Sequence, residues 1–525
     1  MNAVIEQLES RQLFDGGLDS AQIRVSFDGP RPIASQLTIT LGAATVSPIR
    51  VDLSWTVSGL LSPGAFTVER AAGDGPFVPI ATLAASSRSY QSSNLSSDTT
   101  YRYQLRTSGR VSNVASAKTQ KYDAGLNSPF LFPSPVTGRT LNVVTYGATP
   151  NNSSNDDSTA IKNAIAAAVS GDEIYIPNGL YHLKTRDIQL KTGVSIRGES
   201  QSGVVLNAQF SDQGVDNPNS QMFEAKPGVK NFTVSDFSIN LTGGQSMQYG
   251  FYIGSGSTGA VNSSRIAIKN VTVEGFEKFA VAVRHSDNIL VQSCTFKNAT
   301  ALGGGGEGYG VMLGYDTTAN CWVTQSTFGP VLRHGVVVQY SAHHNLIENN
   351  LANATTLDAF DLHGEDEYSN ELRYNTVMNV SGGDGFGVGN TGSTHVDSGP
   401  YNWIHHNEVF NSRGGINIIN GSNDEYIEDN NFHDNTGYGV RVYMGGGSNL
   451  FFMRNTIKRN GVGANISESP NLYMEGNVIS NNSGAALITD SLTVNYTIMN
   501  NDFRSNGAPI VLGSLKGIFL DNLLP

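Results

Sequence analysis

The C-terminal half of the chain repeats one pattern of apolar and polar positions, apolar-x-x-Asn-x-apolar, at intervals of 21 to 32 residues. Each repeat holds two stretches in which apolar and polar residues alternate, such as Ile427–Phe432 and Tyr438–Tyr443. A period of two predicts strands with one buried face, and the Gly, Asn, Asp and Ser between them are typical of turns. The repeated position is occupied by Asn350, Asn375, Asn407, Asn430, Asn455, Asn477, Asn501 and Asn522.

A repeat of this length predicts a solenoid, in which each repeat packs only on its neighbours. Stacked strands lie about 4.8 Å apart, so the asparagines of successive repeats can hydrogen-bond as a ladder. Upstream the same frame continues with Phe237, Val271, Cys294 and Ser326 in the Asn position. We therefore predict an all-β chain built on a parallel β-helix, right-handed by the general handedness of parallel crossovers.

Three segments precede the predicted β-helix, which covers residues 141–525. Residues 1–32 are a polar tail, either disordered or similar to short N-terminal sorting segments of exported bacterial proteins. Residues 33–120 hold short alternating strands and resemble a small fibronectin type III β-sandwich, in which Trp55 takes the place of the family's core Trp. Residues 121–140, with several Pro and Gly, are predicted to be a linker.

The β-helix is predicted to open with a capping helix over Ala160–Val169, with Asp156, Asp157 or Ser158 as its N-cap. A strand follows at Glu173–Pro177. This opening resembles that of pectate-lyase-like β-helix proteins, and the resemblance implies that the helix covers the open end of the solenoid. Such a cover also protects exposed strand edges.

Composition narrows the classes of partner. The chain has 33 Lys and Arg against 45 Asp and Glu, a net charge of −12, and no basic stripe or nucleic-acid-binding motif. We therefore expect no nucleic-acid partner. No apolar run has the length of a membrane span. The oligomeric state is left open by the sequence.

Two repeats are longer than the rest, and they bracket the densest cluster of polar residues in the chain. Their additional residues lie in Gly303–Glu307 and Ser381–Pro400, and long loops on a regular scaffold usually form the walls of binding sites. The polar cluster comprises residues 358–367, Asp384–Phe386 and Arg413–Ile416.

Strand register places the members of this cluster. If Phe360 and Leu362 point inward, Asp361 and His363 point outward on the same rung. The glycines of the next rung would leave a floor for a chain-like ligand. The pairs expected in the same two outward columns are Val337 and Gln339, Gly387 and Gly389, Asn417 and Ile419, and Arg441 and Tyr443.

The order Phe360-Asp361-Leu-His363, Asp384-Gly-Phe386 and Arg413-Gly resembles the catalytic core of the mannuronan C-5 epimerases, which act on alginate. The resemblance implies that Asp361 holds or neutralises the substrate carboxylate and that His363 is an acid or base. It also implies that Asp384 and Arg413 bind substrate and shape the site.

The chain departs from that family at three positions. Asp358, Leu362 and Gly414 stand where the family has its catalytic Tyr, a Pro and a His. Tyr340 and Tyr443 are candidates to replace the missing Tyr. Because one proton-handling group is lost, we place a lyase, which shares the epimerase's first step, ahead of an epimerase.

The remaining candidates concern binding of an acidic polysaccharide. Removal of the proton next to a uronate carboxylate requires that the charge of the carboxylate be neutralised. Carboxylates are the ligands that Ca²⁺ prefers, so Ca²⁺ is a candidate cofactor. The predicted substrate-binding residues are Arg441, Tyr443, Asn417, Gln339 and Tyr340, the candidate calcium ligands are Asp358, Asp361, Glu365 and Asp384, and additional cations are Arg284, Arg333 and Arg413.

The sequence thus predicts a secreted or cell-surface bacterial polysaccharide lyase that acts on alginate or pectate by C-5 proton abstraction and β-elimination. Three alternatives are kept: a mannuronan-type C-5 epimerase, a β-helix glycoside hydrolase that uses Asp361 and Asp384, and a non-catalytic β-helix that binds glycans.

Overall fold

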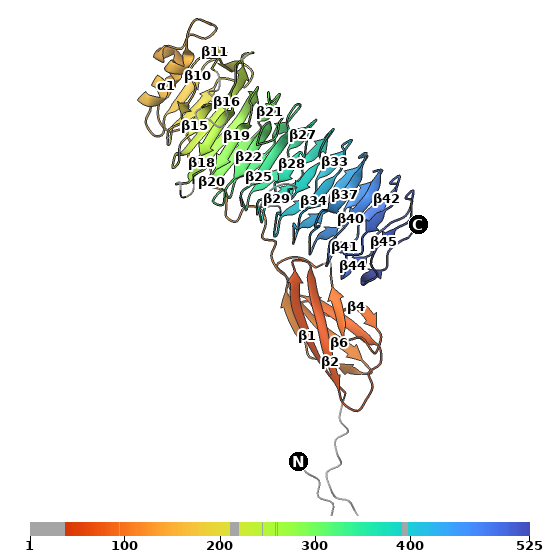
Figure 1. Cartoon of the computed structure of the whole chain (residues 1–525). Coiled ribbons are helices and arrows are strands. Elements are labelled where there is room, and N and C mark those ends of the chain that lie inside the picture. The colour runs from red at the N-terminus through yellow and green to blue at the C-terminus, as the bar shows by residue number, and fades with distance from the viewer. Residues whose placement is uncertain are drawn as a thin grey trace, which may run out of the picture. The chain divides into compact units, whose positions relative to one another are not determined.

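The computed structural model describes residues 37–524 apart from 94, 211–219, 244, 258, 260 and 391–396. The described residues fall into two compact units, which divide between Tyr122 and Asp123 (Figure 1). The predicted tail, residues 1–32, lies outside the described residues.

The first unit is a β-sandwich of two antiparallel sheets, in the orders β1-β2-β5 and β4-β3-β6-β7, with β8 paired to β6. Trp55 of one sheet packs edge-on against Phe66 of the other, with ring centroids 5.5 Å apart. Its assignment to the fibronectin type III family stays a prediction. The strands are β1 (Thr38–Ser47), β2 (Arg50–Ser58), β3 (Phe66–Ala72), β4 (Val78–Leu83), β5 (Ser89–Ser92), β6 (Thr100–Thr107), β7 (Arg110–Val111) and β8 (Ala115–Lys118).

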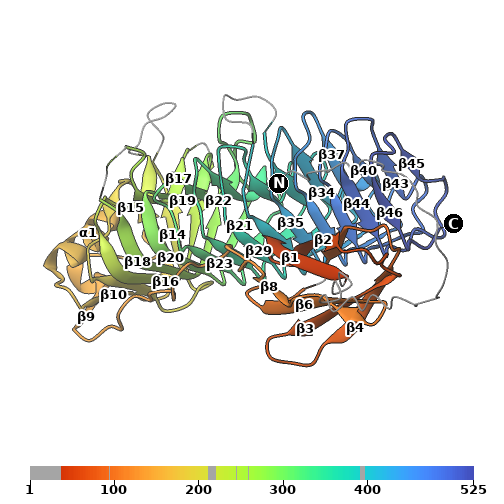
Figure 2. The same cartoon turned by 90° about the horizontal axis from the view of Figure 1, so that it is seen from below.

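The second unit is a parallel β-helix, whose rungs follow one another along its axis in Figure 2. One side is a sheet of 13 parallel strands, here called the long sheet. Its strands are β12 (Ile188–Gln189), β15 (Gln221–Ala225), β17 (Tyr249–Gly254), β19 (Phe279–Arg284), β22 (Tyr309–Gly314), β25 (His334–Gln339), β28 (Phe360–Leu362), β31 (Phe386–Val388), β34 (Ile416–Ile419), β37 (Tyr438–Tyr443), β40 (Val462–Ile466), β43 (Leu487–Thr489) and β45 (Val511–Leu512).

The other strands form two further columns, joined at a corner in each rung. One column comprises β9 (Thr140–Asn142), β10 (Glu173–Ile176), β13 (Ser195–Gly198), β20 (Ser286–Gln292), β23 (Trp322–Thr324), β26 (Leu346–Glu348), β29 (Glu371–Arg373), β32 (Trp403–His405), β35 (Tyr426–Glu428), β38 (Phe451–Met453), β41 (Tyr473–Glu475), β44 (Tyr496–Met499) and β46 (Gly517–Leu520). The next comprises β11 (Gly179–Leu183), β14 (Val204–Ala208), β21 (Thr295–Lys297), β24 (Thr327–Phe328), β27 (Leu351–Asn353), β30 (Thr376–Met378), β33 (Glu408–Phe410), β36 (Asn431–His433), β39 (Thr456–Lys458) and β42 (Val478–Ser480), and β16 (Lys230–Leu241) and β18 (Ser263–Glu274) run through both columns.

The rungs of the C-terminal half have three strands, whereas two per repeat were predicted. The stretch Ile427–Phe432, predicted to be one strand, is divided between β35 and β36. Asp429 between them has a φ of 53°, and this left-handed residue turns the chain sharply. Ile427 and Phe432 are both buried although they are five residues apart, so the alternation shifts by one residue at the corner, and the prediction of a single strand overlooked this shift.

The predicted Asn ladder forms at this corner. The side-chain oxygen of Asn430 accepts hydrogen bonds from N and Nδ2 of Asn407, both at 3.0 Å, and its Nδ2 donates to Asn455 at 3.0 Å and to the carbonyl of Ile404 at 2.9 Å. The two N–H bonds of this buried side-chain amide both donate and its oxygen accepts twice, so the amide is fully hydrogen-bonded, as buried polar groups usually are.

Two more ladders lie at other corners and were not predicted. One runs through Asn345, Asn370 and Asn402 and ends on the carboxyl of Glu425. The other runs through Asn435, Asn460, Asn482 and Asn506, each five residues after a member of the predicted ladder. Buried amide ladders therefore follow the β-helix along three corners.

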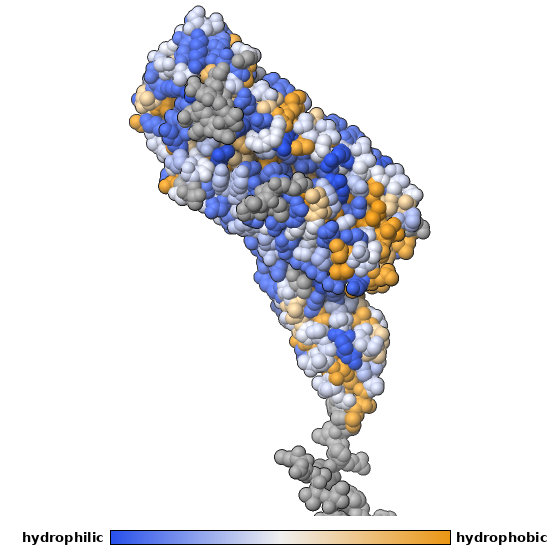
Figure 3. All heavy atoms as spheres, viewed as in Figure 1, coloured by the Kyte–Doolittle hydropathy of each residue, from blue (hydrophilic) through white to orange (hydrophobic). Residues whose placement is uncertain are grey.

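The two ends of the β-helix differ. Helix α1 (Asp157–Ala167), capped by the side chain of Asp156, packs Ile161 and Ile165 on the first rungs, beside the short 3₁₀ helix η1 (Val143–Tyr146), which confirms the predicted capping helix. At the C-terminal end apolar side chains gather on the surface in Figure 3. Those exposed there include Val511, Leu515, Ile518, Leu520 and Leu523.

The segment that follows Tyr122 packs along the β-helix, although the sequence predicted a linker over residues 121–140. Corner asparagines accept hydrogen bonds from its backbone: Asn320 from Asn127 and Asn288 from Leu131. Within the described residues, no helix is long and apolar enough to cross a membrane.

Candidate functional site

The register of the long sheet places the predicted cluster on one outward face. Val337 pairs with Asp361, Asp361 with Gly387, Gly387 with Asn417, and Asn417 with Arg441. Phe360 and Leu362 are buried in the core, as the alternation predicted. In the second column Ile419 pairs with Tyr443, as the sequence predicted.

Asp361 and His363 form a hydrogen-bonded ion pair. Nδ1 of His363 lies 2.7 Å from Oδ2 of Asp361, and the His363 side chain is 24% exposed against 5% for Asp361. Burial acts to lower the pKa of His363, but the charge and hydrogen bond of Asp361 raise it to about 9. Burial acts in the opposite sense on Asp361, but its two histidine neighbours lower its pKa overall, so this carboxylate stays ionised.

A second histidine, His334, lies against the same carboxylate and was not predicted. Its Nδ1 is 3.7 Å from Oδ2 of Asp361 and 2.8 Å from the carbonyl oxygen of Asp358. A carbonyl only accepts, so Nδ1 carries the proton. Burial lowers the pKa of His334 to about 4, so the two histidines around Asp361 differ in charge at neutral pH.

Asp358, Asp384 and Arg413 form the adjoining part of the site. Oδ1 of Asp358 accepts a hydrogen bond from the backbone N of Asp384 at 2.6 Å, and Nη2 of Arg413 lies 2.9 Å from Oδ2 of Asp384. Burial, with the charges of Asp361 and Asp384, holds the pKa of Asp358 well above its usual range. Asp384 therefore positions Arg413, and Asp358 tends to keep its proton.

Two glycines make room for these carboxylates. A Cβ on Gly387 would lie 2.9 Å from oxygens of both Asp358 and Asp361. A Cβ on Gly414 would clash with Oδ1 of Asp384. The first glycine thus does more than leave a floor, and the second makes room for the carboxylate that pairs with Arg413.

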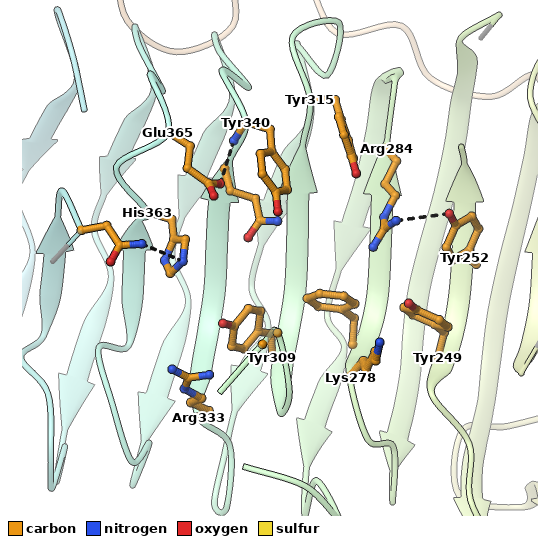
Figure 4. A pocket seen from close by; sticks show the side chains of 15 residues that line it. Tyr249, Tyr252, Lys278, Arg284, Tyr309, Tyr315, Arg333, Tyr340, His363 and Glu365 are labelled. Carbon is orange, nitrogen blue, oxygen red and sulfur yellow. Dashed lines mark hydrogen bonds between the residues drawn. The ribbon is translucent and has the colours of Figure 1, made fainter. Parts of the chain in front are cut away.

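Two connected hollows lie along this face. The first, of about 480 Å³, extends from Tyr249 to His363 and is here called the aromatic trough (Figure 4). The second, of about 170 Å³, contains Asp358, Asp361, Gly387 and Asn417 and is here called the glycine cleft. Arg333, His363 and Asn390 line both, so the ion pair lies where the two hollows meet.

The predicted substrate-binding residues are distributed along this face. Gln339 and Tyr340 line the trough and Asn417 lines the cleft. Arg441 lies farther along the long sheet, with its guanidinium 4.1 Å from the ring centroid of Tyr443 and its Nε 3.3 Å from Oδ1 of Asn417.

The sequence did not predict most of the trough. Tyr249, Phe279, Tyr309 and His334 form one column of paired positions in the long sheet. The frame apolar-x-x-Asn aligns corners and not this column, so these residues were not singled out from the sequence. The signal that would have found them is the recurrence of an aromatic residue at the start of four successive strands, β17, β19, β22 and β25.

The four carboxylates predicted to bind calcium do not form one set of ligands. Asp361 pairs with His363, Asp384 pairs with Arg413, and Glu365 accepts from the backbone N of Tyr340 at 3.2 Å. Among the described residues, no three His, Cys, Asp or Glu side chains are grouped so as to hold a metal ion. Dependence on calcium stays a prediction.

Solved structures with a similar fold come from proteins of several kinds. The A-module of mannuronan C-5 epimerase AlgE6 from Azotobacter vinelandii matches with a TM-score of 0.50 at 17% identity, over 73% of this chain and 100% of its own. The surface adhesin PfbA of Streptococcus pneumoniae matches with a TM-score of 0.45 at 16% identity, over 73% and 100%. At these identities the likeness shows the fold alone.

A hyperthermoactive exopolygalacturonase from Thermotoga maritima matches with a TM-score of 0.44 at 12% identity, over 71% of this chain and 94% of its own. No curated protein sequence matches the chain. The family model "Right handed beta helix region" matches residues 256–432 and 399–523, together just over half of the chain. With its parallel rungs, its corner ladders and this match, the chain belongs to the right-handed β-helix family.

Proposed function

We propose that the chain is a polysaccharide lyase that cleaves a uronic-acid-containing polysaccharide by C-5 proton abstraction and β-elimination. The observation that carries this proposal is the Asp361–His363 pair, which lies where two hollows meet on a face with arginines. The acidic protein as a whole repels a polyanion, so local cations must bind it.

The first requirement is to neutralise the substrate carboxylate. Arg333 lines both hollows, and no described carboxylate lies within ion-pair distance of it. Asp361 is unsuited to this role because its pKa is lowered and its charge serves His363. Asp358, with its raised pKa, supplies a neutral carboxyl that can donate a hydrogen bond to the carboxylate.

The second requirement is a base. His363 is the more accessible of the two histidines, and Asp361 holds its Nδ1 so that Nε2 faces the hollows beside Asn390, whose Nδ2 is 3.3 Å away. With a pKa of about 9, the free base is a minor species at pH 7 and grows as the pH rises.

The elimination is balanced in protons and electrons. Nε2 of neutral His363 takes the C-5 proton, the electrons of the C5–H bond form a C4–C5 double bond, and the C4–O bond to the next sugar breaks. The leaving oxygen takes a proton, which the imidazolium of His363 can return. A C-5 epimerase shares the first step and differs in that a proton returns to C-5 from the opposite face.

A glycoside hydrolase is the second candidate. Its general acid would be Asp358, because the raised pKa of this carboxyl beside two carboxylates is typical of such an acid. A neutral substrate would distinguish the hydrolase from the lyase, since the hydrolase does not need a C-5 carboxylate. Either activity is consistent with a secreted or cell-surface protein, which we propose as the location.

The test is ultraviolet absorbance during incubation with alginate, pectate and other polyuronates, each with added Ca²⁺ and with a chelator. A lyase produces unsaturated uronyl ends and a rising signal that His363→Ala abolishes. A flat trace on every polyuronate would contradict the lyase. Proton NMR of the same samples would then detect inversion at C-5, and reducing-end assays on neutral glycans would detect hydrolysis.

A further inference from the structure

We propose that the end of the aromatic trough remote from His363 is a separate subsite for one acidic sugar unit, with Arg284 as the receptor of its carboxylate. The inference rests on the proposed function, because it takes the ligand to be the same acidic polysaccharide.

Two rows of rings form the walls of the trough (Figure 4). In one row, Tyr249, Phe279 and Tyr309 follow one another with centroids 5.7 and 5.2 Å apart. In the other, Tyr315 stacks on Tyr340 at 4.9 Å. The faces of aromatic rings are electron-rich and attract the polarised C–H bonds of a pyranose ring, so a flat sugar suits the space between the rows.

Arg284 lies between the two rows. Its guanidinium carbon is 5.1 Å from the ring centroid of Tyr252 and 5.8 Å from that of Tyr315, and Nη1 is 3.3 Å from the hydroxyl of Tyr252. Its neighbours in the same column are Gly254 and Gly314, which leave space on both sides of the side chain.

The guanidinium of Arg284 has no carboxylate partner among the described residues, although it is largely buried. Its Nε is buried without a hydrogen bond, and no carboxylate of the described residues lies within ion-pair distance. Arg373, on another side of the β-helix, shows the usual solution, since it pairs with Glu348 and Glu371, each at 2.7 Å. A poorly paired buried charge is costly, and a carboxylate from a ligand would match the planar fork of Arg284.

The chemistry of the trough selects the class of ligand. Lys278, Arg284 and Arg333 all line it, which favours an anion. A small anion such as phosphate would use the cations but not the two rows of rings. A ring that carries a planar carboxylate uses both, and a uronic acid is such a ring.

The subsite is distinct from the reacting position. Arg284 lies three rungs from His363 along one column, and rungs are about 4.8 Å apart, so the two are separated by about 14 Å. One sugar unit cannot contact both. A polysaccharide laid along the axis would place one unit at Arg284 and a later unit at His363.

The experiment measures binding without turnover. In the full chain carrying His363→Ala, calorimetric titration is performed with tetra- to hexamers of mannuronate and galacturonate and with their carboxyl-reduced, neutral counterparts. Adding Arg284→Gln should weaken binding of the better acidic oligomer at least tenfold and leave the neutral oligomers within twofold. Arg284→Lys, which keeps the charge but not the fork, should give an intermediate loss and serves if Arg284→Gln fails to fold.

The matched control is Arg459→Gln, because Arg459 pairs with Asp434 away from the long sheet and should not affect binding. Unchanged affinity in both Arg284 variants, or no binding of any acidic oligomer, would overturn the proposal. If the unmodified chain cleaves a polyuronate but the Arg284 variants bind as before, the proposed lyase is supported and this subsite is contradicted. If binding depends on Arg284 but the unmodified chain cleaves no polyuronate, the subsite is supported and the proposed lyase is contradicted.

Discussion

The corner ladder and the outward face of the long sheet obey opposite rules, although both are columns of the same β-helix. At the corner one residue type recurs, and an asparagine such as Asn430 satisfies its neighbours above and below. On the face, the successive positions Asp361, Gly387 and Asn417 have different residues, and Arg284 has no described carboxylate partner.

The difference separates the residues that stabilise a solenoid from those that can bind a ligand. Repetition satisfies buried polar groups from rung to rung, so a repeated residue contributes to stability. Where repetition stops, polar groups line the two hollows and remain available for a ligand. The comparison predicts that changes on the face reduce activity more than stability, and that changes at the corner do the reverse.

The largest effect is expected from Asp361→Asn. The variant loses the carboxylate that orients His363, so turnover should fall by about 10²- to 10⁴-fold, and because a buried ion pair is lost as well, the melting temperature should fall modestly. The control is Asp434→Asn, which alters a similar pair, Asp434 with His433 at 2.6 Å, away from the long sheet. Equal losses of activity in both variants would contradict a special role for the face.

Asn430→Ala tests the other half of the comparison. It leaves buried donors and acceptors of Asn407, Asn455 and Ile404 without partners, and the free energy of unfolding should fall by about 3 kcal/mol or more. Denaturant unfolding measures this, and activity below the melting temperature should persist. Asn431→Ala, one residue on and half-buried, removes one side-chain hydrogen bond, to Glu408, and should cost far less; similar losses would argue against the ladder.

The pH dependence of kcat/KM tests the charge of His363. If neutral His363 is the base, the rate should rise about tenfold per pH unit below its pKa of about 9 and level off above it. In a residually active Asp361→Asn variant the midpoint should move to lower pH, because the raising effect of the carboxylate is lost. A rate that falls between pH 7 and 9 would instead make His363 the acid.

The smallest effect is expected from Glu425→Gln, at the end of a corner ladder. Burial raises the pKa of Glu425 well above 4.5, so its contribution to stability is complete below about pH 4.5 and is lost as the pH rises toward the folded pKa. Gln keeps the acceptor for Asn402 and cannot ionise. The melting temperature should rise by a few degrees at pH 8 and change little at pH 4. An equal change at both pH values would show that ionisation of Glu425 is irrelevant.

The fold was largely predictable because its signals are local. The Asn frame, the Asp156 cap and the alternation around Phe360 and Leu362 are all read over a few residues, and the structure has each of them. The third strand of the C-terminal rungs was missed because the one-residue shift of the alternation at a left-handed residue such as Asp429 was overlooked.

The site was predictable only in part. The outward positions of Asp361 and His363 and the columns that follow them come from register, which the period of two determines. Their mutual hydrogen bond, the buried His334 and the raised pKa of Asp358 were not predictable, because each depends on burial and on distances between side chains of different rungs.

By itself, the sequence determined the solenoid, its register and the face that carries the ionisable cluster, since local periodicity and spacing suffice for these. Only the tertiary structure decided how that face is divided into an aromatic trough and a glycine cleft, and which arginines meet a carboxylate. Those properties arise where residues from several rungs share one space, and burial and electrostatics act across that space rather than along the chain.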